Sequence, residues 1–113
     1  LQYSLLGGFM LSELKCSQIE KGTPTLPTTE VQKMLIELPG WTLNNSAISR
    51  EFKFKDFTSA MEFVNKVAEI ANAEDHHPDI NISYNKVKME LSTHKIGGLS
   101  MNDFIMAAKI NMI

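Results

Sequence analysis

Several residue types are scarce in this chain of 113 residues. It has one cysteine, Cys16, and one tryptophan, Trp41. A single cysteine excludes a disulfide framework within the chain and is typical of a reducing compartment. We therefore expect a cytoplasmic protein, and a nuclear location also fits. The formal net charge is only −2, so neither nucleic acid nor an anionic membrane surface is expected as a direct partner.

Long apolar runs and phosphate-binding loops are also missing. The apolar stretch at residues 3–11 is interrupted by glycines and is too short to span a bilayer. It also lacks the positive flank of a signal peptide. No glycine-rich loop could cradle a phosphate. The hydrophobic fraction of 43% and the charged fraction of 21% are those of a globular domain.

The start of the chain carries the least information. Residues 22–27, Gly-Thr-Pro-Thr-Leu-Pro, have the composition of a linker. We therefore expect residues 1–27 to be an N-terminal extension, partly disordered or foreign to the natural protein. Residues 28–113 should form one domain.

Hydrophobic periodicity predicts three helices and four strands in that domain. Helices are expected from Thr28 to Pro39, from Asp56 to about Ala73, and after Ser100, where Asp103 can complete a capping box. Strands are expected at residues 41–43, 47–54, 80–84 and 87–91. Short connections favour antiparallel pairing. The predicted fold is α+β, in the order α-β-β-α-β-β-α, with three helices packed on one face of a four-stranded antiparallel sheet.

The long middle helix has an unusually wide apolar surface. Phe63, Val67 and Ile70 form a second apolar stripe beside the first one. Either this helix is deeply buried or the second stripe lies between subunits. We expect a homo-oligomer, a dimer or a tetramer, with the second stripe partly buried in its interface.

All three histidines lie between residues 76 and 94. If Asn85-Lys86 forms a two-residue turn, the hairpin pairs Tyr84 with Val87 and places His77 opposite His94. Imidazole has an unperturbed pKa of about 6.5, so a cluster of imidazoles can supply both an acid and a base near neutral pH. One alternative is unrelated surface histidines. Another is a metal site of His77, His94 and Asp79 or Asp75, although no recognised zinc spacing is present.

The same stretch carries a resemblance to a known family. The run His76-His77-Pro78, the segment Leu91-Ser92-Thr93-His94 and the late segment 102–108 resemble the pterin-4a-carbinolamine dehydratases. The resemblance extends over roughly residues 30–110. This family usually has a carboxylate four residues before the first histidine, and Asn72 occupies that position here.

The resemblance implies a lyase that removes water from a 4a-hydroxy-tetrahydropterin and yields quinonoid dihydropterin, as in tetrahydrobiopterin recycling. It implies neither a metal nor another cofactor. By chemistry, His76 and His77 are the expected proton-transfer pair, with His94 as an orienting residue. The implied pterin-binding residues are Trp41, Asp75, His76, His77, Pro78, Ser92, Thr93, His94 and Lys95. The alternative is a pterin-binding module, or a partner of a transcription factor, with little catalysis.

Overall fold

A computed structural model describes residues 10–113, so most of the apolar stretch at residues 3–11 lies outside the described part. Its main elements, in chain order, are α1 (Thr28–Ile36), β1 (Thr42–Asn44), β2 (Ala47–Lys53), α2 (Phe57–Glu74), β3 (Asp79–Ser83), β4 (Lys86–Leu91) and α3 (Met101–Asn111). Two short 3-10 helices, η1 (Leu11–Glu13) and η2 (His94–Ile96), complete the fold. Within residues 10–113, no helix has the length and apolar character needed to cross a membrane.

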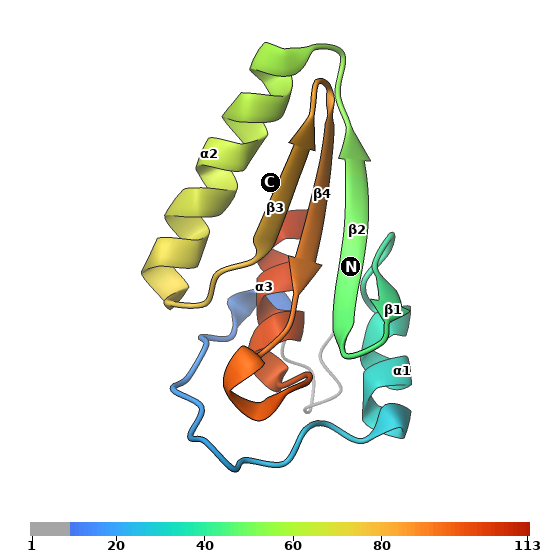
Figure 1. The fold of residues 1–113 in the computed structure, drawn as a ribbon, viewed down its shortest axis with the longest axis vertical. Coiled ribbons are helices and arrows are strands. Elements are labelled where there is room, and N and C mark those ends of the chain that lie inside the picture. Colours follow the sequence, from blue (N-terminus) through green and yellow to red (C-terminus); the bar gives the residue numbers. More distant parts are fainter. Residues whose placement is uncertain (1–9) are drawn as a thin grey trace.

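The four strands form one antiparallel sheet in the order β1-β2-β4-β3 (Figure 1). Ile48, Val87, Met89 and Leu91 are fully buried and share one core cluster with residues of all three α-helices. Lys86 and Lys88 alternate with these residues on β4 and are exposed. The alternation confirms an α+β fold with its helices on one side of the sheet.

The hairpin of β3 and β4 forms, but its predicted register is wrong by two residues. Ile82 pairs with Val87 and Ile80 with Met89, so the turn consists of Tyr84 and Asn85. Asn85 is fixed from outside the hairpin, because its side chain donates to the carbonyl of Phe54 at 2.9 Å and its own carbonyl accepts from the Phe54 amide at 2.8 Å. A shift of two residues preserves the buried face, and burial therefore could not reveal the error.

Helix α2 begins as predicted at the N-cap Asp56, whose Oδ1 accepts from the Ser59 amide at 2.8 Å. Phe63 and Val67 lie in the core of their own chain, with 8% and 0% of their surface exposed. The prediction that these two residues contact a second subunit is therefore wrong, since one chain already buries them, whereas Ile70 is half-buried and its place in an interface stays a prediction. Oligomerisation itself stays a prediction.

Residues 10–27 differ from the expected loose extension. Leu11 is fully buried in the common core, and Lys109 Nζ donates to the Ser12 carbonyl at 2.8 Å. Further on, the Leu26 amide donates to the Leu99 carbonyl at 2.9 Å. Figure 1 shows this segment, coloured blue, running from α3 around the lower end of the molecule to α1. Leu11, Ser12 and Leu26 thus attach this segment to the packed domain, and residues 16–19 form part of the site described next.

Candidate active site

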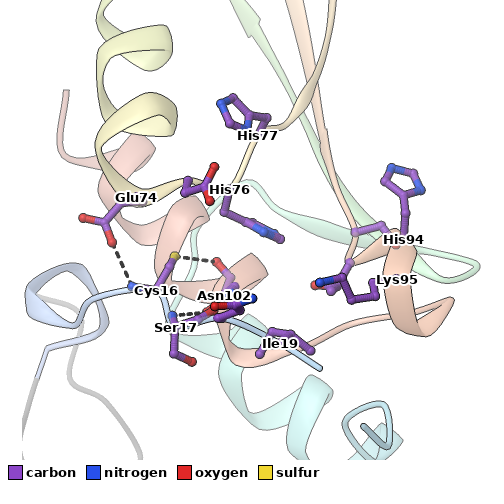
Figure 2. A pocket seen from close by; sticks show the side chains of 13 residues that line it. Cys16, Ser17, Ile19, Glu74, His76, His77, His94, Lys95 and Asn102 are labelled. Atoms are coloured by element: carbon purple, nitrogen blue, oxygen red, sulfur yellow. Dashed lines mark hydrogen bonds between the residues drawn. The ribbon is translucent and has the colours of Figure 1, made fainter. Parts of the chain in front are cut away.

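A cavity of about 540 Å³ lies where the end of α2, the end of β4 and the first turn of α3 meet. All three histidines line it, coming from two separate segments of the chain (Figure 2). Its remaining walls are Cys16, Ser17, Gln18, Ile19, Glu74, Asp75, Ser92, Thr93, Lys95 and Asn102. Thus seven of the sequence-predicted site residues come together here: Asp75, His76, His77, Ser92, Thr93, His94 and Lys95.

His76 is the most firmly held of the three histidines. Helix α2 ends at Asp75, which adopts a left-handed conformation with φ 53°, and the His76 amide then donates to the Ala71 carbonyl at 3.2 Å. This turn directs the His76 ring toward α3, where Nε2 lies 2.7 Å from Asp103 Oδ1. The His76 side chain is only 12% exposed. Both its backbone and its ring are therefore fixed.

Asp103 is fully buried, and each of its carboxylate oxygens is satisfied. Oδ1 accepts from His76, while Oδ2 accepts from Thr93 Oγ1 at 2.8 Å and from the Ser100 amide at 2.9 Å. Because a carboxylate oxygen accepts, His76 Nε2 is the donor in this pair. The other ring nitrogen, Nδ1, is then the one left to exchange a proton with a ligand. A carboxylate that fixes the tautomer of a histidine in this way is a common support for acid–base chemistry.

His77 has a different partner and is exposed. Its Nε2 lies 3.0 Å from Asn72 Oδ1, one turn back on α2. An amide oxygen only accepts, so Nε2 donates here too and Nδ1 is again the other nitrogen. Asn72 therefore supplies an acceptor for His77 although it is not the carboxylate usual at this position.

His94 is the least constrained of the three. It begins η2, directly after β4, and its side chain is 80% exposed. Its closest carboxylate is Asp79, with 4.0 Å between His94 Nε2 and Asp79 Oδ2. The predicted cross-strand pairing of His77 with His94 is wrong. The ladder between β3 and β4 begins at Asp79 and Glu90, which leaves both histidines outside it.

Two predicted binding residues do not line the cavity. Trp41 is 4% exposed in the core, and its Nε1 donates to Asn111 Oδ1 at 2.9 Å, near the end of α3. Arg50 Nη1 donates to the same oxygen at 2.6 Å. This network explains the indole as a buried structural group. Pro78 lies next to His77 but is not part of the cavity wall.

Sequence reasoning missed several residues of the site. Asp103 was noted as a helix cap, a role it also performs, and within the resembling segment 102–108, but not as a residue of the site. Asn102 was noted only as part of the resembling segment 102–108, without a role in the site. Glu74 and residues 16–19 carry no motif, and only their contacts in the fold reveal them. Within residues 10–113, no three His, Cys, Asp or Glu side chains gather as metal ligands would.

The fold and site define a small α+β protein with a histidine-lined cavity, supported by a buried carboxylate and suited to proton transfer. The family model described as pterin 4 alpha carbinolamine dehydratase matches residues 24–113. The chain therefore belongs to the pterin-4a-carbinolamine dehydratase family, which confirms the resemblance found in its sequence.

Individual relatives agree with this assignment. A protein of Nitrosomonas eutropha is 47% identical over 104 residues, which cover 91% of this chain and 92% of that one. A protein of Rickettsia canadensis is 47% identical over 103 residues, covering 89% of this chain and 94% of the relative. Both carry the provisional name pterin-4-alpha-carbinolamine dehydratase.

A solved structure is similar as well. The crystal structure of a transcriptional coactivator/pterin dehydratase from Brucella melitensis has a TM-score of 0.76 and 38% identity. It covers 79% of this chain and 97% of its own. The family model begins at residue 24, whereas the Nitrosomonas alignment spans 104 residues and so includes residues before that point. The N-terminal segment thus has counterparts in relatives.

Proposed function

We propose that this protein dehydrates a 4a-hydroxy-tetrahydropterin to the quinonoid dihydropterin by histidine acid–base catalysis, in the recycling of tetrahydrobiopterin. One observation carries the proposal. Three imidazoles line one cavity, and one of them, His76, is locked to the fully buried Asp103. A buried carboxylate held by three donors is costly to build, because its desolvation must be offset by those contacts.

The reaction requires two proton movements. A base removes the proton from the ring N–H next to the hydroxylated carbon, and the nitrogen electron pair forms a C=N bond. The C–O bond breaks at the same carbon, and an acid protonates the departing hydroxyl, which leaves as water. Positioned side chains can perform both transfers, each typically contributing ~10²–10⁴-fold in rate.

His76 and His77 are the proposed proton-transfer pair. Both donate through Nε2 to a protein acceptor, Asp103 or Asn72, so each can use Nδ1 toward the ligand. His76 donates through Nε2 to a carboxylate, which leaves Nδ1 as the nitrogen with a free lone pair, and it is therefore the proposed base that takes up the ring proton. His77, paired with a neutral amide, is the proposed acid. His94, exposed at the rim, orients the ligand.

The remaining wall residues suit a flat heterocycle with many polar edges. Ser92 and Thr93 come from the end of β4, and Lys95 adds a cation beside His94. Thr93 is only 6% exposed, and its hydroxyl hydrogen is used by Asp103, so Ser100 Oγ is the donor in the 2.7 Å contact with Thr93 Oγ1. Thr93 therefore supports Asp103. Ser92 Oγ donates to the Ser46 carbonyl at 2.9 Å and is left as an acceptor, so Lys95 is the better candidate for donating a hydrogen bond to the ligand.

A direct assay tests this function. Purified protein is added to freshly formed 4a-hydroxy-tetrahydropterin, and quinonoid product is followed by absorbance against the spontaneous rate. Pterin binding is measured separately by calorimetry with an oxidised pterin. The proposal expects acceleration over the spontaneous reaction. Binding without acceleration would support the pterin-binding module instead, and the absence of both would remove the pterin assignment from this cavity.

A further inference from the structure

The N-terminal segment Lys15–Ile19, called the strap below, is fastened across one side of the cavity by two buried side chains. Glu74 Oε1 accepts from the Cys16 amide at 2.8 Å, and the Glu74 side chain is 5% exposed. Asn102, 4% exposed, makes a reciprocal pair with Ser17: Oδ1 accepts from the Ser17 amide at 3.0 Å, and Nδ2 donates to the Ser17 carbonyl at 2.7 Å. Two consecutive backbone units of the strap are therefore fixed.

These anchors tie the strap to the proposed proton-transfer site. Asn102 and Asp103 are neighbours in the first turn of α3, and the first holds Ser17 while the second holds His76. Glu74 is the last residue of α2 and lies two positions before His76. In Figure 2 the strap passes on the side of His76 that faces away from His77 and His94. The strap is thus the cavity wall next to His76.

The backbone N–H and C=O groups of the strap that hydrogen-bond to Asn102 and Glu74 are already paired. They therefore cannot form hydrogen bonds with the fixed donors and acceptors at the edge of a pterin ring. What the strap still offers is side chains at the cavity rim. Ser17 and Gln18 are exposed, and Ile19 is half-buried. An open wall with mixed polar and apolar side chains suits the variable part of a ligand better than its invariant ring.

We infer that the strap is the specificity wall for the substituent on carbon 6 of the pterin, an inference that rests on the proposed function. Carbon 6 is bonded to the ring nitrogen that loses its proton, so its substituent leaves the ring beside the proton-transfer group. With His76 as that group, the adjoining wall is the strap. Asn102 is then a positioning residue, which acts by holding Ser17 and Ile19 in place.

Cys16 provides a built-in reporter of strap position. It is the only cysteine of the chain, and its Sγ lies 3.7 Å from the Asn102 carbonyl. Burial, together with the nearby Glu74 carboxylate, raises the pKa of the Cys16 thiol to about 12. Alkylation of Cys16 by iodoacetamide should therefore be slow while the strap is fastened, and faster when it is released.

The experiment uses the full chain, two variants and two substrates. The substrates are 4a-hydroxy-tetrahydropterins that differ only at carbon 6, with methyl in one and dihydroxypropyl in the other. In Asn102→Ala, alkylation of Cys16 should accelerate about tenfold, because two hydrogen bonds to the strap are lost. KM should rise about tenfold for the dihydroxypropyl substrate and less than about twofold for the methyl substrate, with kcat within about twofold for both.

Ile19→Ala serves as the second variant, since it removes a half-buried side chain and leaves both anchors intact. It should raise KM for the dihydroxypropyl substrate about threefold, without faster alkylation of Cys16. Asn65→Ala, on the exposed side of α2, is the matched control and should resemble the wild type. A ligand test runs alongside: oxidised biopterin should slow wild-type Cys16 alkylation more than 6-methylpterin does at equal saturation.

Three results would overturn the inference. The first is an equal change of KM for both substrates, or no change for either, in Asn102→Ala and Ile19→Ala. The second is unaltered Cys16 alkylation in a folded Asn102→Ala protein. The third is equal protection of Cys16 by the two oxidised pterins. If wild-type protein dehydrates neither substrate, the proposed function fails, while the protection experiment still decides whether the strap contacts the substituent.

Discussion

At the scale of single residues, Asp103 combines two tasks that sequence patterns treat separately. The capping-box pattern predicted its place in the first turn of α3 correctly. The same carboxylate also holds His76, 27 positions away in the chain, at 2.7 Å. The cap accounted for this residue, and the resembling segment 102–108 assigned it no role in the site, so its contact with His76 was not predicted. The three histidines were predictable as a group because they are rare, but their individual partners were not.

Asp103→Asn tests this second role. The amide keeps an acceptor for the Ser100 cap but then turns its NH2 group toward His76 Nε2, which loses the acceptor that fixes its tautomer and orientation. We therefore expect kcat to fall about 10- to 100-fold with little change in KM. Steady-state dehydration kinetics measure both values, and circular dichroism checks the fold. Thr93→Val is the control, since it removes one donor to Asp103 and leaves the His76 contact. An Asp103→Asn protein with wild-type kcat would show that His76 needs no carboxylate.

At the scale of elements, the three α-helices and the four strands could be predicted, whereas the pairing of β3 with β4 and the two 3-10 helices could not. Alternating apolar residues fix which face of a strand is buried, and a shift by two residues leaves that face unchanged. The deciding contact, between Asn85 and Phe54, joins residues 31 positions apart. As a consequence Tyr84, not Lys86, enters the turn, with φ 53°.

Because Tyr84 adopts a left-handed conformation, we predict that one substitution at this position stabilises the folded protein. A side chain with a Cβ is strained at positive φ, whereas asparagine tolerates it, and Tyr84 is 64% exposed and contributes little to packing. Tyr84→Asn should therefore raise the free energy of unfolding by about 0.5–1 kcal/mol, measured by urea denaturation. Tyr84→Ala, which keeps the strain, should bring no gain. Lower stability of Tyr84→Asn would indicate that the ring makes a contribution in solution that outweighs the strain.

Glu74 holds the strap through the Cys16 amide, and we predict that this attachment weakens at acid pH. Burial alone would raise the pKa of Glu74, but hydrogen bonds from the Cys16 amide and Lys15, with the charge of Lys109, lower it below the ordinary 4.5. A lowered folded pKa means that the stabilising contribution is present above pH 4.5 and is lost as pH falls through the folded value. Hydrogen-exchange protection of the Cys16 amide should therefore decrease several-fold in this acid range.

Glu74→Gln is the matched variant for that experiment. It keeps an acceptor for Cys16 but has no charge to titrate, so its protection should be lower than the wild type at neutral pH and nearly independent of pH. A wild-type protection factor that stays constant from pH 7 to 3 would contradict the assigned role of Glu74.

At the scale of the whole molecule, one core joins the sheet, the three helices and the N-terminal segment. The wide apolar surface of α2 left two explanations open, and burial within the chain accounts for Phe63 and Val67. The underlying reason is that Leu11 and α3 both pack into the same core as α2, which a local pattern on α2 cannot reveal. For the same reason the sequence could not assign residues 10–27 to the domain.

Phe63→Ala distinguishes a core position from an interface position. Phe63 packs against Phe52 and Phe54, with ring centroids 4.7 and 5.0 Å away. Its truncation should lower the free energy of unfolding by about 3–5 kcal/mol. The loss should be the same at low and high protein concentration, because the contacts lie within one chain. Phe57→Ala, on an exposed position of the same helix, should cost far less. A loss for Phe63→Ala that depends on concentration would restore the interface explanation.

The measurement that tests the central claim most directly is the dehydration rate of a histidine series. His76→Ala and His77→Ala should each reduce kcat by ~10²–10⁴-fold, because each removes a positioned proton donor or acceptor. The double variant should be little worse than the poorer single one, since the pair acts as a unit. His94→Ala, in contrast, should weaken substrate binding as well as turnover. All four proteins should keep the wild-type fold by circular dichroism. A His76→Ala, His77→Ala protein that dehydrates 4a-hydroxy-tetrahydropterin at the wild-type rate would contradict the account.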